Sequence, residues 1–144
     1  MRSYSHNTAL ERVPASPAFD GLGLDGLCHC LNCMSGQVLE FDGMEEIKLP
    51  AGCSVLCAVL DGSAILTWRD SGEEISILPR DRVFSYSASI SDVYALMSAP
   101  GLRLLVFDSA RAAIPCGNNC MYHLTLMRSI AAMMMRRDLD PVRE

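Results

Sequence analysis

From Val38 to Phe107 the chain alternates short apolar runs with turn residues, and the first five turns lie eight to ten residues apart. Even spacing of short β-rich runs between Gly, Asp and Pro turns is typical of an antiparallel sandwich or barrel. We therefore predict a mainly β fold of about seven or eight strands. The clearest runs are CSVLCAVL (53–60), SAILTWR (63–69), EEISIL (73–78), RVFSY (82–86), DVYALM (92–97) and LRLLVF (102–107).

Two of the turns also predict how neighbouring strands pair. Asp61-Gly62 stands between two apolar runs, which is a strong hairpin signal. Asp70-Ser71-Gly72 stands between the next two runs and predicts a second hairpin with a slightly longer loop. We expect the strands on each side of these turns to be partners.

Helical periodicity precedes and follows the predicted strands. A short helix is predicted from about Leu24 to Met34, with Gly36 at the position of a C-terminal cap. After Phe107 the pattern is helical again. The apolar face of the first helix is expected to comprise Leu24, Leu27, Cys28, Leu31 and Met34.

The last predicted helix has more apolar surface than one domain needs. Its apolar arc is roughly 200° wide, whereas a helix packed on one side needs about 100°. Within it, one set of residues has the 4-3-4-3 spacing of a coiled-coil seam. We expect a parallel homodimer through this helix; the alternative is that the methionines only fill the domain's own core. The seam is Cys120, Leu124, Met127, Ala131 and Met134.

Composition and charge reduce the number of partner classes that this chain could bind. The 144 residues suit one domain, and the net charge of −5 argues against direct DNA binding by this chain alone. No apolar run is long enough to span a bilayer, and the N-terminus has no apolar core of the signal-peptide type. We expect a cytoplasmic protein with no membrane partner.

The seven cysteines are an odd number in a chain without an export signal, so most are expected to be free packing thiols. Cys28 and Cys30 point about 200° apart on a helix and cannot share a metal unless that helix unwinds, although Cys30 and Cys33 could. Packing is favoured for all three. Cys57, with Cys53 on the same side of its strand, is expected in the core.

Cys116, Cys120 and His123 form a second group of soft ligands, within eight residues. Three ligands leave a structural zinc site incomplete. The simpler interpretation is a strand end followed by a capped helix, with Cys116 and Cys120 kept as redox candidates. We predict no metal and no cofactor.

No catalytic residues are predicted, because neither a nucleophile–base pair nor an acid/base carboxylate pair stands out. The predicted strands contain no histidine, which the metal-binding cupins need. A small cupin-like binding protein or enzyme remains the alternative to a regulatory module.

The order of elements and several local strings over residues 16–138 resemble the sensor domain of the Crp/Fnr family of bacterial transcription regulators, of the clostridial type. The family's β-roll turns resemble Val59–Ala64 and Ile77–Phe84, with Arg80 where a glycine is expected. The string PCGNNCMYH (115–123) resembles the start of the family's dimer helix. The resemblance implies an antiparallel double-stranded β-roll, of cupin or jelly-roll type, with a short N-terminal helix and a long C-terminal dimerisation helix.

The same resemblance implies an effector-sensing and dimerisation module. It divides the chain into an N-terminal arm (1–15), a helix and sensor roll (16–114) and a dimer helix (115–140), with the family's helix-turn-helix absent. The effector, if there is one, is an unknown small molecule. Residues 85–92 lack the Gly-Glu and the arginine of the cyclic-nucleotide cassette, so we expect no tight binding of cyclic AMP or cyclic GMP. The candidate ligand-binding residues are Phe84, Ser85, Tyr86 and Ser87.

Overall fold

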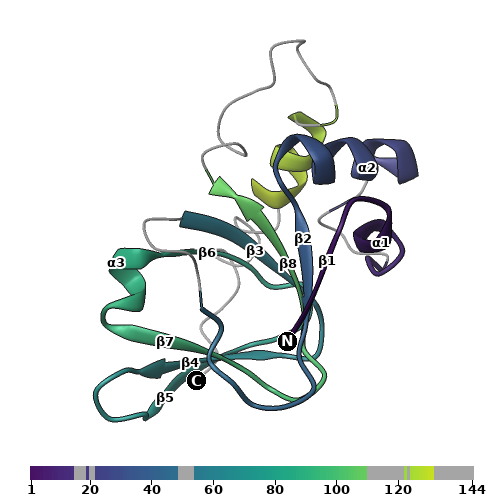
Figure 1. Ribbon diagram of the computed structural model, residues 1–144. Coiled ribbons are helices and arrows are strands. Elements are labelled where there is room, and N and C mark those ends of the chain that lie inside the picture. The colour runs from purple at the N-terminus through teal and green to yellow at the C-terminus, as the bar shows by residue number, and fades with distance from the viewer. Residues whose placement is uncertain (15–18, 20–21, 49–53, 110–121, 123, 132–144) are drawn as a thin grey trace.

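The computed structural model describes residues 1–14, 19, 22–48, 54–109, 122 and 124–131. Eight strands and three helices, followed by a further helix at residues 124–131, make up this part of the chain (Figure 1). In chain order they are β1 (Arg2–Ser5), α1 (His6–Leu10), α2 (Gly23–Cys33), β2 (Gln37–Glu40), β3 (Ser54–Asp61), β4 (Ala64–Trp68), β5 (Glu74–Leu78), β6 (Val83–Ser87), α3 (Ala88–Ser91), β7 (Tyr94–Ser98) and β8 (Arg103–Asp108).

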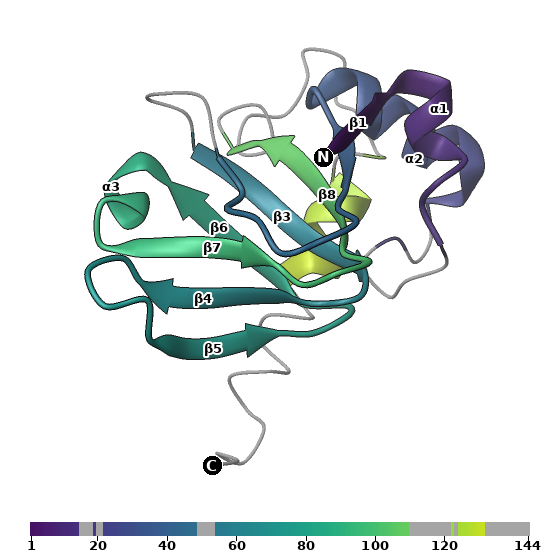
Figure 2. The ribbon, with the colours of Figure 1, turned by 60° about the horizontal axis from the view of Figure 1, so that its bottom comes forward.

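The strands form two facing sheets, and every pair of strands is antiparallel. One sheet has the order β1-β2-β8-β3-β6 and the other the order β5-β4-β7. Figure 2 shows the smaller sheet in front of β3 and β6, with α1, α2 and the 124–131 helix on the far side of the larger sheet and α3 at the end where β6 leads to β7. The chain crosses from one sheet to the other four times after β3. The predicted antiparallel β-roll is confirmed.

Strand β3 is an inner strand of the larger sheet and is buried on both faces, which explains why it reads as a continuous apolar run. Alternate residues of β3 point into the roll or toward the helices. Val55, Cys57 and Val59 belong to the cluster inside the roll. Leu56, Ala58 and Leu60 belong to the cluster formed with α1, α2 and the 124–131 helix.

The predicted first helix is confirmed, but the face that it buries is shifted. Leu27, Cys30 and Leu31 are buried, whereas Leu24 is 73% exposed and Cys28 is only half-buried. The prediction that Leu24 and Cys28 lie in the core is therefore wrong. Gly26 explains the shift, because the ring of Tyr122 lies 2.7 Å from where a Cβ on Gly26 would be. Tyr122, shortly before the 124–131 helix, thus packs against the side of α2 that carries Gly26.

The cap of α2 also differs from the prediction by one residue. Ser35, not Gly36, has the left-handed conformation (φ 52°), and the Gly36 N–H donates to the Leu31 carbonyl at 2.7 Å, as in a Schellman motif. Gly36 is needed for space instead. A Cβ there would lie 2.7 Å from atoms of both the Leu31 and the Phe107 side chains.

The two predicted hairpins have different outcomes. Asp70-Ser71-Gly72 does join partners, since β4 pairs with β5 and Gly72 has a φ of 73°. Asp61-Gly62 does not, because β3 pairs with β6 and β8 while β4 belongs to the other sheet. This turn is a corner between sheets, where Gly62 lies against the backbone of Gly101 and Leu102.

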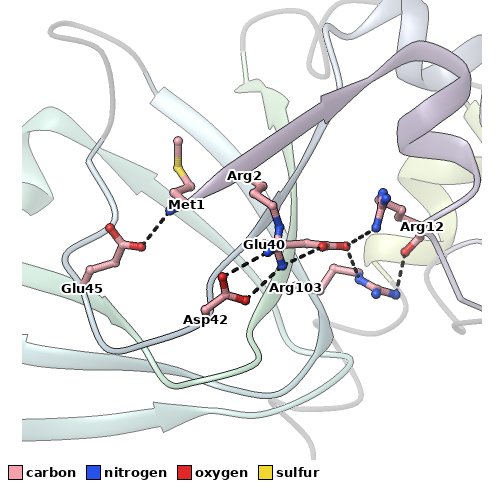
Figure 3. Close-up of polar contacts among 7 residues, drawn as sticks. All are labelled: Met1, Arg2, Arg12, Glu40, Asp42, Glu45 and Arg103. Carbon is pink, nitrogen blue, oxygen red and sulfur yellow. Dashed lines mark hydrogen bonds and ion pairs between the residues drawn. The ribbon is translucent and has the colours of Figure 1, made fainter.

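The N-terminus contains a strand and a helix that were not predicted. β1 extends the larger sheet beyond β2 as an edge strand. Figure 3 shows what holds it there: the buried carboxylate of Glu40 lies 3.4 Å from the Arg2 guanidinium, 3.1 Å from that of Arg12 and 3.0 Å from that of Arg103. Arg2 also pairs with Asp42 through two contacts of 3.0 Å. Charge-assisted contacts therefore replace the apolar signal that marks the other strands.

Candidate functional site

The four predicted ligand-binding residues all lie in β6, and they have different roles in the fold. Phe84 is paired with Cys57 and Tyr86 with Val55, so both rings face the inside of the roll. Ser85 is exposed on the other face of the strand. Ser87 caps the short α3, accepting a hydrogen bond from the Ile90 N–H at 3.4 Å.

This β6–α3 corner is closed by its own contacts. The buried Tyr86 hydroxyl donates to the Tyr94 carbonyl at 2.8 Å. Burial raises the pKa of Tyr86, and the nearby Arg69 lowers it only in part. Arg69 donates to the Ser91 carbonyl at 2.6 Å and forms a two-pronged pair with Glu46 at 3.1 and 3.2 Å. Arg69 is thus committed to holding α3 in place.

A recess lies on the inner face of the larger sheet, on the side away from β6. A pocket of about 330 Å³ is lined by residues of β1, β2, β3 and β8 and of the loops beside them. Sequence patterns gave no sign of it, because its residues come from segments far apart in the chain. They are Met1, Ser3, Ser35, Gln37, Leu39, Lys48, Ser54, Val55, Val106 and Asp108.

The apolar arc of the last predicted helix is divided between two surroundings. Leu126 and Ile130 are buried in the cluster behind the larger sheet, and Met127 is half-buried against it. Leu124 is 43% exposed and Ala131 is exposed one heptad later, on the same side of the helix. Cys120 and Met134, the ends of the predicted seam, lie outside the described residues.

Four cysteines are described, and none of these four forms a disulfide. Cys57 is 1% exposed, and burial raises the pKa of its thiol to about 12, which confirms its place in the core. Cys30 is buried, whereas Cys28 and Cys33 are half-buried. Within the described part of the chain, no group of three or more His, Cys, Asp and Glu side chains is placed to hold a metal ion. The redox candidates Cys116 and Cys120 fall outside it.

In sequence, no protein-family model and no curated protein matches the chain. In structure, the chain is similar to the catabolite activator protein of Thermus thermophilus, with a TM-score of 0.53 and 18% identity over 85% of this chain. It spans 58% of that activator's length.

Two shorter proteins match over nearly their whole length. A putative cyclic nucleotide-binding protein from Geobacter metallireducens has a TM-score of 0.54 and 18% identity, over 83% of this chain and 90% of that one. The N-terminal domain of a transcriptional regulator from Streptomyces coelicolor has a TM-score of 0.51 and 15% identity, over 90% of this chain and 95% of that one. The predicted resemblance to Crp/Fnr-type sensor domains is therefore confirmed as a likeness of fold. The clostridial type stays a prediction.

No helix in the described ranges is both long enough and apolar enough to cross a membrane. The expected division of the chain into arm, roll and dimer helix remains a prediction too, as does the expected cytoplasmic location.

Proposed function

We propose that this chain is the effector-sensing and dimerisation module of a Crp/Fnr-like transcription regulator. The observation that carries the proposal is the 124–131 helix behind the roll. One flank of it, with Leu126 and Ile130, is buried on the domain, and the next flank, with Leu124 and Ala131, is exposed.

The exposed flank suits a second copy of the same helix. Leu124 and Ala131 are seven residues apart, and Met127 lies between them at the edge of the buried flank. This spacing repeats the a and d positions of a two-stranded coiled coil. In a parallel two-fold contact each side chain meets its own copy, so one apolar stripe is self-complementary. Dimerisation would remove Leu124 from water without disturbing the roll.

The sensing half of the proposal rests on the roll. The similar structures include a protein named as cyclic nucleotide-binding and the N-terminal domain of a regulator. For this chain we propose an effector other than a cyclic nucleotide. At the β6–α3 corner Ser87 already caps α3, and Arg69 is already paired with Glu46. Neither is available for a phosphate without breaking these contacts.

Multi-angle light scattering of the purified protein tests the dimer. The wild type should have twice the mass of one chain, and Leu124→Glu should reduce it to a monomer, because two carboxylates would face each other across the axis. Leu124 is a better probe than Met127, which also packs on its own domain. Ile77→Glu is the matched control: Ile77 is 54% exposed on β5 of the smaller sheet, away from the helix.

A monomeric wild type would refute the dimerisation role. So would a Leu124→Glu variant that stays dimeric like Ile77→Glu.

A further inference from the structure

The pocket on the inner face of the larger sheet is a built recess whose wall is the N-terminal strand. The register places Ser3 beside Leu39, Leu39 beside Leu104, and Gln37 beside Val106, so these side chains share one face. β1 contributes Ser3 to the lining, and Met1, just before β1, lines it too. Its position is fixed by the Arg2–Asp42 contacts and by the Met1 ammonium, 3.1 Å from Glu45 (Figure 3).

The lining combines an apolar floor with a polar rim. We call the apolar strand residues Leu39, Val55 and Val106 the floor, and the hydroxyl and amide groups in the lining the rim. A pocket of this volume with an apolar floor and a few polar groups suits a small organic molecule. The polar rim is Ser3, Ser35, Gln37 and Ser54.

The charged residues at the pocket favour a negatively charged ligand group beside Lys48. Lys48 is the chain's only lysine, and it is exposed at the pocket. In the described part of the chain it makes no hydrogen bond or ion pair. Asp108, the carboxylate at the pocket, is engaged in an interaction of its own. The Met1 ammonium is paired with Glu45. Lys48 is therefore the cation available to a ligand.

We propose that this pocket is the effector site and that it binds a small amphipathic anion, with its apolar body on Leu39, Val55 and Val106 and its acidic group at Lys48. This inference rests on the proposed sensing function. Because β1 forms one wall, a bound ligand also holds the N-terminal strand against the sheet, which links occupancy to the order of residues 2–5.

The experiment uses the whole chain and the fluorescent probe 1-anilinonaphthalene-8-sulfonate, an aromatic body with one acidic group. Probe titrations are run on the wild type, on Lys48→Gln, and on Val106→Phe, which fills the floor. Octanoate is added as a competitor, with the uncharged 1-octanol beside it. Arg80→Gln is the matched control, since Arg80 is exposed, carries the same charge and does not line the pocket.

We expect saturable binding to the wild type that octanoate displaces far better than octanol does. Lys48→Gln should weaken probe binding about tenfold, the loss of one charge-assisted contact, and Arg80→Gln should not change it. Val106→Phe should also weaken it, while circular dichroism checks that this variant folds. Hydrogen exchange of residues 2–5 should slow when the probe is bound.

Absence of saturable binding to the wild type would overturn the ligand class. Wild-type affinity in Lys48→Gln would overturn the site, since it means that the probe binds elsewhere, for example on the apolar face around Leu124. Light scattering on the same samples separates these results from the proposed function. A dimer that fails to bind the probe refutes only the pocket, and a monomer that binds it refutes only the dimer.

Discussion

The negative charge of Glu40 helps to hold the N-terminal strand in place. Burial alone would raise the pKa of Glu40, but hydrogen bonding and charge from Arg12, with Arg103 and Arg2, outweigh burial and hold the pKa below its ordinary value. The carboxylate therefore stabilises the folded state when it is ionised. This contribution is fully present above the pKa of an unfolded glutamate, about 4.3, and is lost as the pH falls through the lower folded-state value.

We predict that Glu40→Gln lowers the free energy of unfolding by about 1–3 kcal/mol near neutral pH, because three arginines lose their common acceptor. Because the arginines are partly exposed and solvent screens their charges, we expect a value in the lower part of that range. Urea unfolding from pH 7 to pH 3 measures it. The gap between wild type and variant should shrink below about pH 4.

Glu73→Gln, at an exposed turn, is the control and should match the wild type throughout. If the difference in unfolding free energy between the wild type and Glu40→Gln stays constant down to pH 3, the loss of stability comes from the altered side-chain shape and not from the lost charge.

Cys57 gives a second prediction at the residue scale. With a pKa of about 12 and almost no exposure, its thiol should not react with iodoacetamide at pH 8 in the folded protein. Peptide mapping by mass spectrometry should find Cys57 labelled only after unfolding, and the half-buried Cys28 labelled before it. Labelling of Cys57 at the rate of Cys28 in the native protein would contradict the described core.

At the scale of elements, the end of α2 depends on the absence of one side chain. Gly36→Ala should destabilise the protein by about 1–3 kcal/mol, because the new methyl group would push on Leu31 and Phe107. Gly43→Ala is the matched control: nothing lies within 4 Å of its Cβ position, and its change should stay within about 0.5 kcal/mol. Thermal unfolding of both variants checks the pair, and equal effects would refute the steric account.

The elements that sequence predicts well are those whose signal is local. Strands β3 to β8 follow from alternating apolar runs between turns, and α2 follows from its helical period. β1 was missed because Arg2–Ser5 is almost entirely polar; its partners are charges, which leave no periodic pattern. The Asp61-Gly62 turn was misassigned because turn chemistry shows that the chain bends, not which strand it then joins.

The candidate site was harder to predict than the fold for a related reason. Phe84–Ser87 could be selected because the resemblance marks that segment, and the structure shows that Phe84 and Tyr86 fill the interior there. The pocket could not be selected, since Gln37, Val55 and Val106 become neighbours only through strand pairing. Only one feature of the sequence could have pointed to Lys48, namely that it is the chain's only lysine.

At the scale of the whole molecule, the roll has one large sheet buried on both faces and a helical layer behind it (Figure 1). The pocket opens on the inner face of that sheet, and the exposed flank of the 124–131 helix lies in the layer on the other side. The proposed effector site and the proposed dimer contact thus lie on opposite faces of a single sheet. In the proposed function, the sheet is the element through which occupancy of the pocket reaches the dimer.

Photo-cross-linking at position 124 tests the central claim, which is that this helix face meets its own copy. With p-benzoylphenylalanine in place of Leu124, irradiation of the dilute protein should produce a covalent dimer, because a parallel two-fold contact places each residue 124 beside its partner. The same probe in place of Ile77, on the smaller sheet, should leave the chain monomeric on a denaturing gel. A cross-linked dimer at both positions, or at neither, would contradict the account.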